Sequence, residues 1–433
     1  MPREPRPASS AARDALAARK LDRFRRLLGE MLPRNSFYAA KLARVADPQG
    51  IRSLADLGDW PFTFKEELVG AIAAGRPGNL TWPIERYVRY HQTSGTHGRP
   101  LPVFDTAADW QWWMEPWRIV LDRGGVERSD TVLVASSFGP YAGFWSGFDA
   151  AVARGALTIP TGGLTSLARL EAIAERRATV LLATPSYALH LAEVGRETKI
   201  DTTALGIRLV IVAGEPGGSV PATRRRIAAA WNADVLDHAG ATEVGPWGVG
   251  DLHGDGIDVI EEFFHPEFLS LASGGPAEPG ESAELVLTTL GRCGAPVIRY
   301  RTGDVVRPTW ATAADVEAGA CPWVRLDGGI VGRTDDMLVI RGVNVFPQAI
   351  DEIVRGFPEV VEHRLTAATR ESLDELMLEI EDHLDDPDRV ARELKVRLGL
   401  RVDVRTVPPG ALPRFEGKGR RFVDHRTKPE ETA

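Results

Sequence analysis

The middle of the chain alternates short, β-branched apolar runs with stretches of helical periodicity, and this alternation constrains the fold most. Five such runs end in a Gly, Pro or polar turn and are predicted to be buried strands, over residues 131–139, 155–163, 178–185, 207–216 and 233–243. Helical patterns such as SLARLEAIAERR and PATRRRIAAAWN separate them. Strands that alternate with helices predict an α/β domain with a mainly parallel sheet. In such sheets, ligands bind at the carboxyl ends of the strands.

Two further units follow along the chain. From about residue 281, ESAELVLTTL and PVIRYRTGDVVRP predict the longer strands of a β-rich subdomain. After GRTDD, a pattern of strand, helix, two strands, helix, strand and glycine-rich tail predicts a compact α+β unit of about a hundred residues. The predicted fold class is therefore α/β, with an N-terminal domain over residues 1–334 and a C-terminal domain over residues 335–433.

Composition and charge limit the class of protein. Of the 433 residues, 43% are hydrophobic and 26% are charged, as in a soluble globular protein. A net charge of −8 disfavours a nucleic-acid binder, and no apolar stretch reaches the roughly 18 residues of a membrane span. Two cysteines, and an N-terminus without the apolar core of a secretion signal, predict a cytoplasmic protein. The first helix is expected to bury Leu16, Leu21, Phe24, Leu27 and Leu28.

The segment HQTSGTHGRP, residues 91–100, gathers glycines and hydroxyl side chains and closes with Arg99 and a proline. Backbone N–H groups bind anions, and glycine lets them approach a phosphate without a Cβ in the way. The segment lacks the Gly-Lys-Ser/Thr ending of a P-loop and continues into an extended LPVF instead. On these residues alone, a phosphate-binding loop and a surface linker both remain open.

Four further segments follow this loop in order: GATE at 240–243, YRTGD at 300–304, GRTDD at 332–336 and LPRFEGK at 412–418. With SGT at 94–96, they resemble the signature segments of the adenylate-forming superfamily of acyl-CoA synthetases. Longer phrases such as TPSYALHLAE and DDMLVIRGVNVFPQAIDEIV resemble the phenylacetate–CoA ligase family in particular. The resemblance implies a large adenylate-forming domain with mainly parallel sheets and a β-rich subdomain, followed by a small mobile C-terminal α+β domain.

The resemblance also implies a nucleotide site built from these segments. Asp304 would accept the ribose hydroxyls, Thr242 would contact the α-phosphate, and Glu243 would be the ligand of Mg²⁺. The residues implied to bind ATP are Thr93, Ser94, Gly95, Thr96, Gly98, Arg99, Gly214, Glu215, Pro216, His238, Ala239, Gly240, Ala241, Thr242, Asp304 and Arg333.

The implied catalytic residues are Lys418, Thr242 and Glu243. A carboxylate must attack the α-phosphate of ATP, so two anions have to be held together while charge develops. The ammonium of Lys418, on a glycine-flanked tail, can bridge both groups in the transition state.

The second half-reaction is implied to use another arrangement of the domains. Relatives rotate the C-terminal domain about a hinge that corresponds to Asp335, and GRTDD lies between the two predicted domains. The rotation would bring into use a coenzyme A tunnel lined by Arg341, Gly342 and Asn344.

The acyl pocket of the family corresponds to FGPYAGFW at residues 138–145. Phe138, Tyr141 and Phe144 are therefore candidate pocket residues, with Trp247 opposite them. A turn packed on the core explains any single one of them equally well. The tryptophans of DWQWWMEPW at 110, 113 and 117 share one helical face, which predicts core packing instead.

Three positions depart from the pattern of the family. Ala239 replaces an aromatic residue that would stack on adenine, and His238 is the neighbouring ring that could substitute for it. His97 stands where relatives carry Thr, and Arg99 where they carry Lys. Because Arg is a good phosphate ligand, the loop should still bind ATP.

The whole pattern predicts an AMP-forming ligase that uses ATP and Mg²⁺ to activate a small aryl carboxylic acid and transfers it to coenzyme A. One alternative delivers the acyl group to a carrier-protein thiol or an amine. The other is a non-catalytic nucleotide-binding relative, against which the joint presence of Lys418, Glu243 and Asp304 argues. The expected partners are small molecules rather than nucleic acid or membrane, and a homodimer is left open.

A structural zinc ion is not expected. The candidate ligands include no Cys-x-x-Cys pair and lack the tight spacing of zinc sites. They are His253, Asp258, Cys293 and Cys321.

Overall fold

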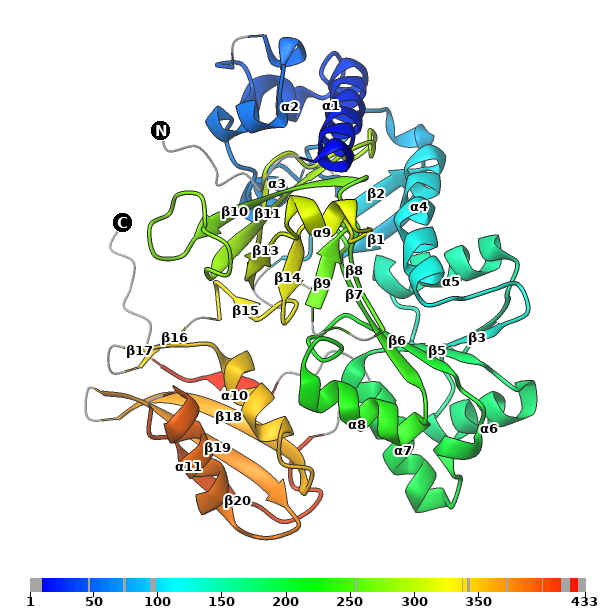
Figure 1. Cartoon of the computed structure of the whole chain (residues 1–433), viewed down its shortest axis with the longest axis vertical. Helices are drawn as coiled ribbons and strands as arrows, with labels where there is room; N and C mark the ends of the chain where they lie inside the picture. The colour runs from blue at the N-terminus through cyan, green and yellow to red at the C-terminus, as the bar shows by residue number, and fades with distance from the viewer. Residues whose placement is uncertain are drawn as a thin grey trace.

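The structure is a computed structural model, and Figure 1 shows its arrangement from the N-terminal helices to a separate C-terminal unit. No helix in the described part of the chain is both long and apolar enough to cross a bilayer. The described residues are 10–45, 47–72, 75–93, 99–252, 254, 256–336, 338–340, 343–370, 373–398, 400–413 and 421–426.

A mixed sheet forms the centre of the N-terminal domain. In the described residues it has nine strands in the order β13-β14-β9-β8-β7-β6-β5-β3-β4. Strands β4, β3, β5, β6 and β7 are parallel and lie within the five predicted runs, whereas β8, β9, β14 and β13 pair antiparallel. The bounds are β3 Thr131–Val134, β4 Leu157–Pro160, β5 Val180–Ala183, β6 Leu209–Ala213, β7 Asp234–Ala241, β8 Gly245–Gly250, β9 Gly256–Val259, β13 Pro308–Thr309 and β14 Arg325–Asp327.

Helices cover both faces of the parallel strands. Successive strand residues point to opposite faces, so Val132 and Val134 join the core beneath α4 and α5, while Leu133 joins the core beneath α6, α7 and α8. Thr106, Thr165 and Thr184 cap α4, α6 and α7 by accepting a backbone N–H, which explains where these helices begin. The bounds are α4 Ala107–Arg123, α5 Ala142–Arg154, α6 Ser166–Arg176, α7 Pro185–Thr198 and α8 Pro221–Trp231.

The N-terminal helices pack on the β-rich subdomain. Leu16, Phe24, Leu27 and Leu28 of α1 are buried as predicted, whereas Leu21 is only partly buried at the edge of the same cluster. In this block, α1 is Ala11–Met31, α2 is Ser36–Lys41 and α3 is Lys65–Gly70, with 3-10 turns η1 Pro48–Gly50, η2 Leu54–Asp59 and η3 Ile84–Arg86. The subdomain contains β10 Phe264–Ser270, β11 Ala283–Thr289, β12 Tyr300–Val306, β15 Gly332–Arg333 and α9 Ala313–Glu317, and a hairpin of β1 Tyr87–Gln92 with β2 Pro102–Thr106 precedes α4.

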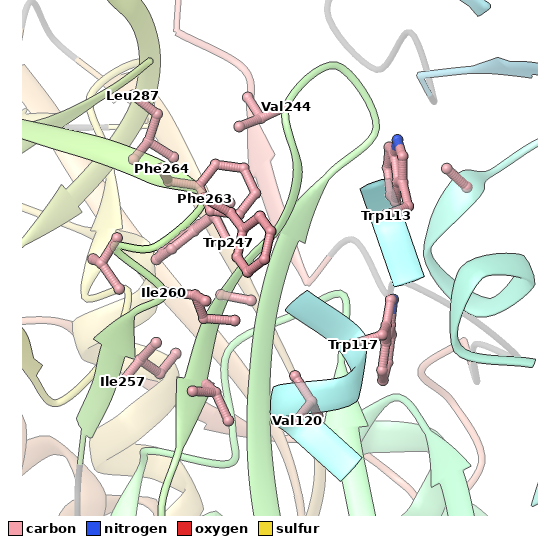
Figure 2. Packing of buried hydrophobic residues seen from close by; sticks show 14 of the residues in the cluster. Trp113, Trp117, Val120, Val244, Trp247, Ile257, Ile260, Phe263, Phe264 and Leu287 are labelled. Carbon is pink, nitrogen blue, oxygen red and sulfur yellow. The ribbon is translucent and has the colours of Figure 1, made fainter. Parts of the chain in front are cut away.

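The tryptophans of α4 belong to the core, as their spacing predicts. Trp110, Trp113 and Trp117 are buried on the helix, which continues through Pro116. Figure 2 shows Trp113 and Trp117 on α4, with Trp247 packed beside Phe263 across the core.

The C-terminal unit has its own sheet and core. The order β20-β19-β18-β21 is flanked by α10 and α11, and Ile350, Leu378 and Leu394 are buried between them. Its elements confirm the α/β fold with a C-terminal α+β domain, but the single strand predicted before the first helix is a hairpin of β16 and β17, and a further strand, β21, follows β20. They are β16 Leu338–Ile340, β17 Val343–Val345, α10 Pro347–Arg355, β18 Val360–Arg370, β19 Leu373–Asp382, α11 Pro387–Leu398, β20 Asp403–Thr406 and β21 Phe422–Asp424.

Candidate active site

Polar residues gather at the carboxyl ends of the neighbouring strands β5, β6 and β7. The backbone N–H of Ser186, in the first turn of α7, donates a 2.7 Å hydrogen bond to Glu215 Oε1. Gly214 has a φ of 92°, which favours glycine at the turn that leaves β6. The segments Thr184–Ser186 and Gly214–Pro216 are therefore linked directly at the sheet edge where ligands bind in this architecture.

Glu243 lies in the turn between β7 and β8, and its side chain is mostly buried. The hydroxyl of Tyr300 donates to Glu243 Oε1 at 2.8 Å, and Lys65 Nζ lies 3.5 Å from the same oxygen. Burial and the adjacent Glu243 charge raise the pKa of Tyr300 well above its usual value, so the phenol stays protonated and donates. The carboxylate is thus held in place by residues from α3 and β12.

A fully buried ion pair supports this turn from behind. Asp105 Oδ1 receives hydrogen bonds from Arg292 Nε at 2.8 Å and from Trp113 Nε1 at 3.2 Å, and lies 2.7 Å from Arg292 Nη2. Arg292 Nη1 also donates to the backbone oxygen of Glu243 at 2.8 Å. Because Asp105 belongs to β2, this guanidinium joins the β1–β2 hairpin to the Glu243 turn.

The β1–β2 connection contains the predicted phosphate loop. Thr93 and Leu101 close its base with two 3.0 Å hydrogen bonds, one from the N–H of Thr93 to the Leu101 oxygen and one from the N–H of Leu101 to Thr93 Oγ1. Arg99 is exposed beside this closed base. Ser94, Gly95, Thr96, His97 and Gly98 lie outside the described residues.

Asp304 and Arg333 face each other on the paired strands β12 and β15. Arg333 Nη1 donates to Asp304 Oδ1 at 3.0 Å, and Arg333 Nε donates to Asp335 Oδ1 at 2.9 Å. Burial opposes the charged form, but these carboxylates raise the pKa of Arg333. Gly303 has a φ of 75°, and a Cβ there would lie 2.7 Å from Arg333 Nη2, so both the backbone conformation and this contact favour glycine.

The β7 segment that is predicted to contact adenine presents no exposed aromatic ring, because His238 is buried and residue 239 is an alanine. His238 is buried, its Nδ1 lies 2.7 Å from the Gly248 oxygen, and its ring centroid is 4.3 Å from that of Trp117. Burial lowers the pKa of His238 to about 4, so the ring is neutral near pH 7. Ala239 is buried opposite Gly248, while Gly240, Ala241 and Thr242 continue toward the Glu243 turn.

Three of the four candidate acyl-pocket residues lie in the connection from β3 to α5 or in the first turn of α5. Phe138 is partly buried, with its ring centroid 4.8 Å from that of Trp145, and Tyr141 is 47% exposed. A φ of 50° at Phe138 is strained for an aromatic residue, a feature that concentrates at functional sites. Phe144 is partly buried on α5, whereas Trp247 is fully buried in the core of Figure 2 and presents no surface to a ligand.

Several predicted residues of the C-terminal unit lie outside the described residues, namely Arg341, Gly342 and Lys418. Asn344 is described only as backbone within β17. Arg421 follows Lys418 by three residues and donates to Glu362 at 2.6 and 3.0 Å. The charge of Glu215 contributes to the raised pKa of Arg421, so Arg421 lies within electrostatic range of the Gly214–Pro216 segment.

Glu243 is the residue of this site that could hold a magnesium ion. Mg²⁺ is usually held by one or two carboxylates together with substrate phosphates, and Glu243 offers such a carboxylate. Asp258, a zinc candidate, is instead engaged by Arg123 at 3.0 Å and Arg325 at 3.4 Å. Within the described ranges, which omit His253, no group of three or more His, Cys, Asp or Glu side chains could hold a metal ion.

Sequence reasoning did not assign roles to Lys65, Arg292 or the Tyr300 hydroxyl. Lys65 lies in the first turn of α3, far from Glu243 in sequence, and nothing in its local pattern indicates the contact. The available signal was indirect, because Tyr300 is the first residue of the YRTGD segment and Arg292 lies in a short Gly-Arg-Cys-Gly segment.

Comparison with known proteins identifies relatives along nearly the whole chain. Residues 87–278 match the AMP-binding enzyme family, and residues 342–426 match the AMP-binding enzyme C-terminal domain. A phenylacetate-coenzyme A ligase of Thermus thermophilus is 32% identical over 445 residues, which cover 96% of this chain and 97% of the relative.

Two crystal structures of a 2-hydroxyisobutyryl-CoA ligase resemble this chain to different degrees. The postadenylation state with 2-HIB-AMP gives a TM-score of 0.87 at 26% identity and covers 96% of this chain and 91% of that chain. The thioesterification state with 2-HIB-AMP and CoA gives a TM-score of 0.70 at 27% identity, with 97% and 91% covered. The domain arrangement of this chain is therefore closer to the postadenylation state.

Proposed function

This chain belongs to the AMP-binding enzyme family, and we propose that it is an ATP-dependent, AMP-forming ligase that joins a small aryl carboxylic acid to coenzyme A. The observation that carries the proposal is the Glu243 carboxylate, held by Tyr300 and Lys65 at the sheet edge where ligands bind. Asp304 and Arg333 lie on strands of the same subdomain as Tyr300.

In the first half-reaction, the acid attacks the α-phosphate of ATP and pyrophosphate leaves. Glu243 would hold Mg²⁺, which neutralises charge on the phosphate oxygens. Thr242 would contact the α-phosphate, and Lys418 would bridge the incoming carboxylate and that phosphate as charge develops. The contacts of Glu243 favour this assignment, because they fix the carboxylate before the metal and the nucleotide arrive.

The nucleotide would lie across the edge formed by the Gly214–Pro216 and Gly240–Thr242 segments. Asp304 would accept the ribose hydroxyls, and Arg333, which already donates to Asp304, would contact the ribose and phosphates. Thr93 and Arg99 would position the loop on the β- and γ-phosphates. His238 and Ala239 would contribute the floor beneath adenine rather than a stacked ring.

The second half-reaction requires Lys418 to leave and a thiol to reach the acyl carbonyl. We propose that the domains divide at residues 334 and 335 and that Asp335 is the hinge, since β15 ends at Arg333 and β16 begins at Leu338. Rotation there would bring the 341–344 segment along the coenzyme A tunnel. The 2-hydroxyisobutyryl-CoA ligase is solved in a postadenylation and a thioesterification state, and its similarity to this chain supports proposing the same exchange here.

The acid would bind between β3 and α5. Phe138, Tyr141 and Phe144 offer aromatic surface to an aryl acid, and the strained backbone of Phe138 points to a constrained pocket wall. The similarity to a phenylacetate-coenzyme A ligase favours an aryl acid over a short aliphatic acid.

The experiment that tests the proposal measures AMP release from ATP with a panel of aryl and short-chain acids, each with and without coenzyme A. Rapid AMP release that requires both an aryl acid and coenzyme A, with a thioester product, is the expected result. Acid-dependent exchange of pyrophosphate into ATP without coenzyme A turnover would instead assign a carrier-protein thiol or an amine as the acceptor. No nucleotide chemistry with any acid would contradict the proposal.

A further inference from the structure

A cavity of about 580 Å³ lies between the N-terminal domain and the C-terminal unit. Helices α7 and α8 line one side of it, and α10 with β18 lines the other, in the region where α8 and α10 face each other in Figure 1. Its volume falls within the range of small-molecule sites. Because both domains supply its walls, the cavity exists only while they keep this arrangement.

The cavity extends well away from the candidate active site. Its inner end includes Ser186, whose N–H donates to Glu215. It then follows α7 to Arg196, ten residues further along the helix, which corresponds to about 15 Å at the rise of an α-helix. The Arg196 end of the cavity is therefore separate from the Glu215 segment proposed to hold ATP.

Most of the charged groups that line the cavity already have partners. Arg355 Nε donates to Asp351 at 2.6 Å, and Arg421 makes two hydrogen bonds to Glu362. Arg226, from the middle of α8, differs from them, because it forms neither a hydrogen bond nor an ion pair with any residue that the structure describes.

The surroundings of Arg226 favour an additional negative charge. Burial lowers the pKa of Arg226, and the charges of Arg355 and Arg196 lower it further, against the weaker opposing effects of Asp351 and Glu362. A partly desolvated guanidinium without a partner is unfavourable, and an anion placed beside it would remove this cost.

We propose that this cavity binds a small phosphorylated anion through Arg226 and Arg196, and that the bound anion stabilises the present arrangement of the two domains. The planar guanidinium matches two phosphate oxygens at once, which suits Arg226 to this role. Since the walls come from both domains, any ligand of the cavity binds this arrangement better than one in which the domains have rotated. Such an anion would therefore favour adenylation and oppose thioester formation.

The test compares the full-length protein with two variants on the same helix. Arg226→Gln removes the proposed ligand, and Arg225→Gln is the matched control, because Arg225 is exposed and does not line the cavity. Inorganic phosphate, pyrophosphate and AMP are titrated separately by calorimetry. A fluorescence pair across the two domains reports their arrangement.

Arg226→Gln loses a pair of charge-assisted hydrogen bonds and is expected to bind one of the three probes roughly tenfold or more weakly than wild type. Arg225→Gln should bind the same probe with unchanged affinity. The same probe should shift the domains toward the present arrangement in the wild-type protein and in Arg225→Gln. A response to phosphate and pyrophosphate alone would identify an inorganic anion as the ligand, and a response to AMP would identify a nucleotide. Equal binding of all three probes by Arg226→Gln and wild type, or equal losses in both variants, would overturn the proposal.

Discussion

Replacing Arg292 with Met tests whether the buried ion pair behind Glu243 supports the site. The guanidinium and the Asp105 carboxylate have no exposed side-chain surface, and Asp105 Oδ2 accepts no hydrogen bond from the described residues. Removing one partner of a buried pair leaves an uncompensated charge, which costs about 3 to 5 kcal/mol. With a urea m-value of about 3 kcal/mol/M, the unfolding midpoint should fall by about 1 M or more.

The pH dependence of this loss gives a second test. Burial raises the pKa of Asp105, and the Arg292 charge opposes that rise, so the pKa should be higher still in Arg292→Met. When the pKa of a carboxyl is higher in the folded state than its unfolded value of about 3.9, the folded protein becomes less stable as the pH rises between these two pKa values. The deficit relative to wild type should therefore be smaller at pH 5 than at pH 8.

The assay is urea unfolding at both pH values, with Arg26→Met as the control. Arg26 pairs with Asp22 at 2.6 Å on the exposed face of α1, where an ion pair contributes about 0 to 1 kcal/mol. Adding Asp105→Asn to Arg292→Met should recover part of the loss, because the two positions are in direct contact. A loss below about 1 kcal/mol, or equal deficits at both pH values, would refute the reasoning.

Three other substitutions test separate parts of the site. Lys418→Ala should abolish adenylation yet leave thioester formation from a supplied acyl-adenylate, and equal loss of both half-reactions would remove Lys418 from its proposed role. Tyr300→Phe removes the hydrogen bond that the phenol donates to the charged Glu243 carboxylate, so the Mg²⁺ concentration for half-maximal AMP release should rise roughly tenfold or more. An unchanged Mg²⁺ concentration would contradict the role of Tyr300 in holding Glu243. Burial raises the pKa of Asp237 to about 6, so Asp237→Asn should gain stability relative to wild type as the pH rises from 4 to 6, by about 2 kcal/mol, and a flat difference in unfolding free energy would falsify it.

Elements whose signal is local could be predicted from the sequence. Four of the five parallel strands, β3, β5, β6 and β7, are mostly buried, and each has the predicted pattern of a short β-branched run that ends in a turn. The prediction of a buried strand is wrong for β4, because this strand lies at the edge of the sheet and Leu157 is exposed. The C-terminal unit was likewise recognisable because its helices and strands follow one another with ordinary periodicity. The helix of residues 11–31 was predicted with one error, since Leu21 lies at the edge of its apolar face and is only half-buried.

Contacts between distant positions could not be predicted in the same way. Asp105 and Arg292 are 187 residues apart, and Lys65 and Glu243 are brought together only by tertiary packing. Such pairs leave no periodic trace in a single sequence. Trp247 shows the related ambiguity of aromatic residues, because a ring in a ligand pocket and a ring in the core have the same sequence pattern.

The supporting contacts divide the site into a part fixed by one domain and a part supplied by the other. Tyr300, Lys65 and Arg292 all hold Glu243 from within the N-terminal domain. The C-terminal unit contacts the N-terminal domain at two places: Gln348 donates to a backbone oxygen of that domain, and α10 packs against α8. Arg226 of α8 lies at the second contact and lacks a partner among the described residues. Disrupting the Asp105–Arg292 pair would leave a buried charge uncompensated, whereas Arg226 at the α8–α10 contact has no partner among the described residues to lose, so separating the domains should cost less than reshaping the carboxylate site. Substitutions along the α8–α10 contact should therefore change the ratio of the two half-reaction rates before they change the stability of either core.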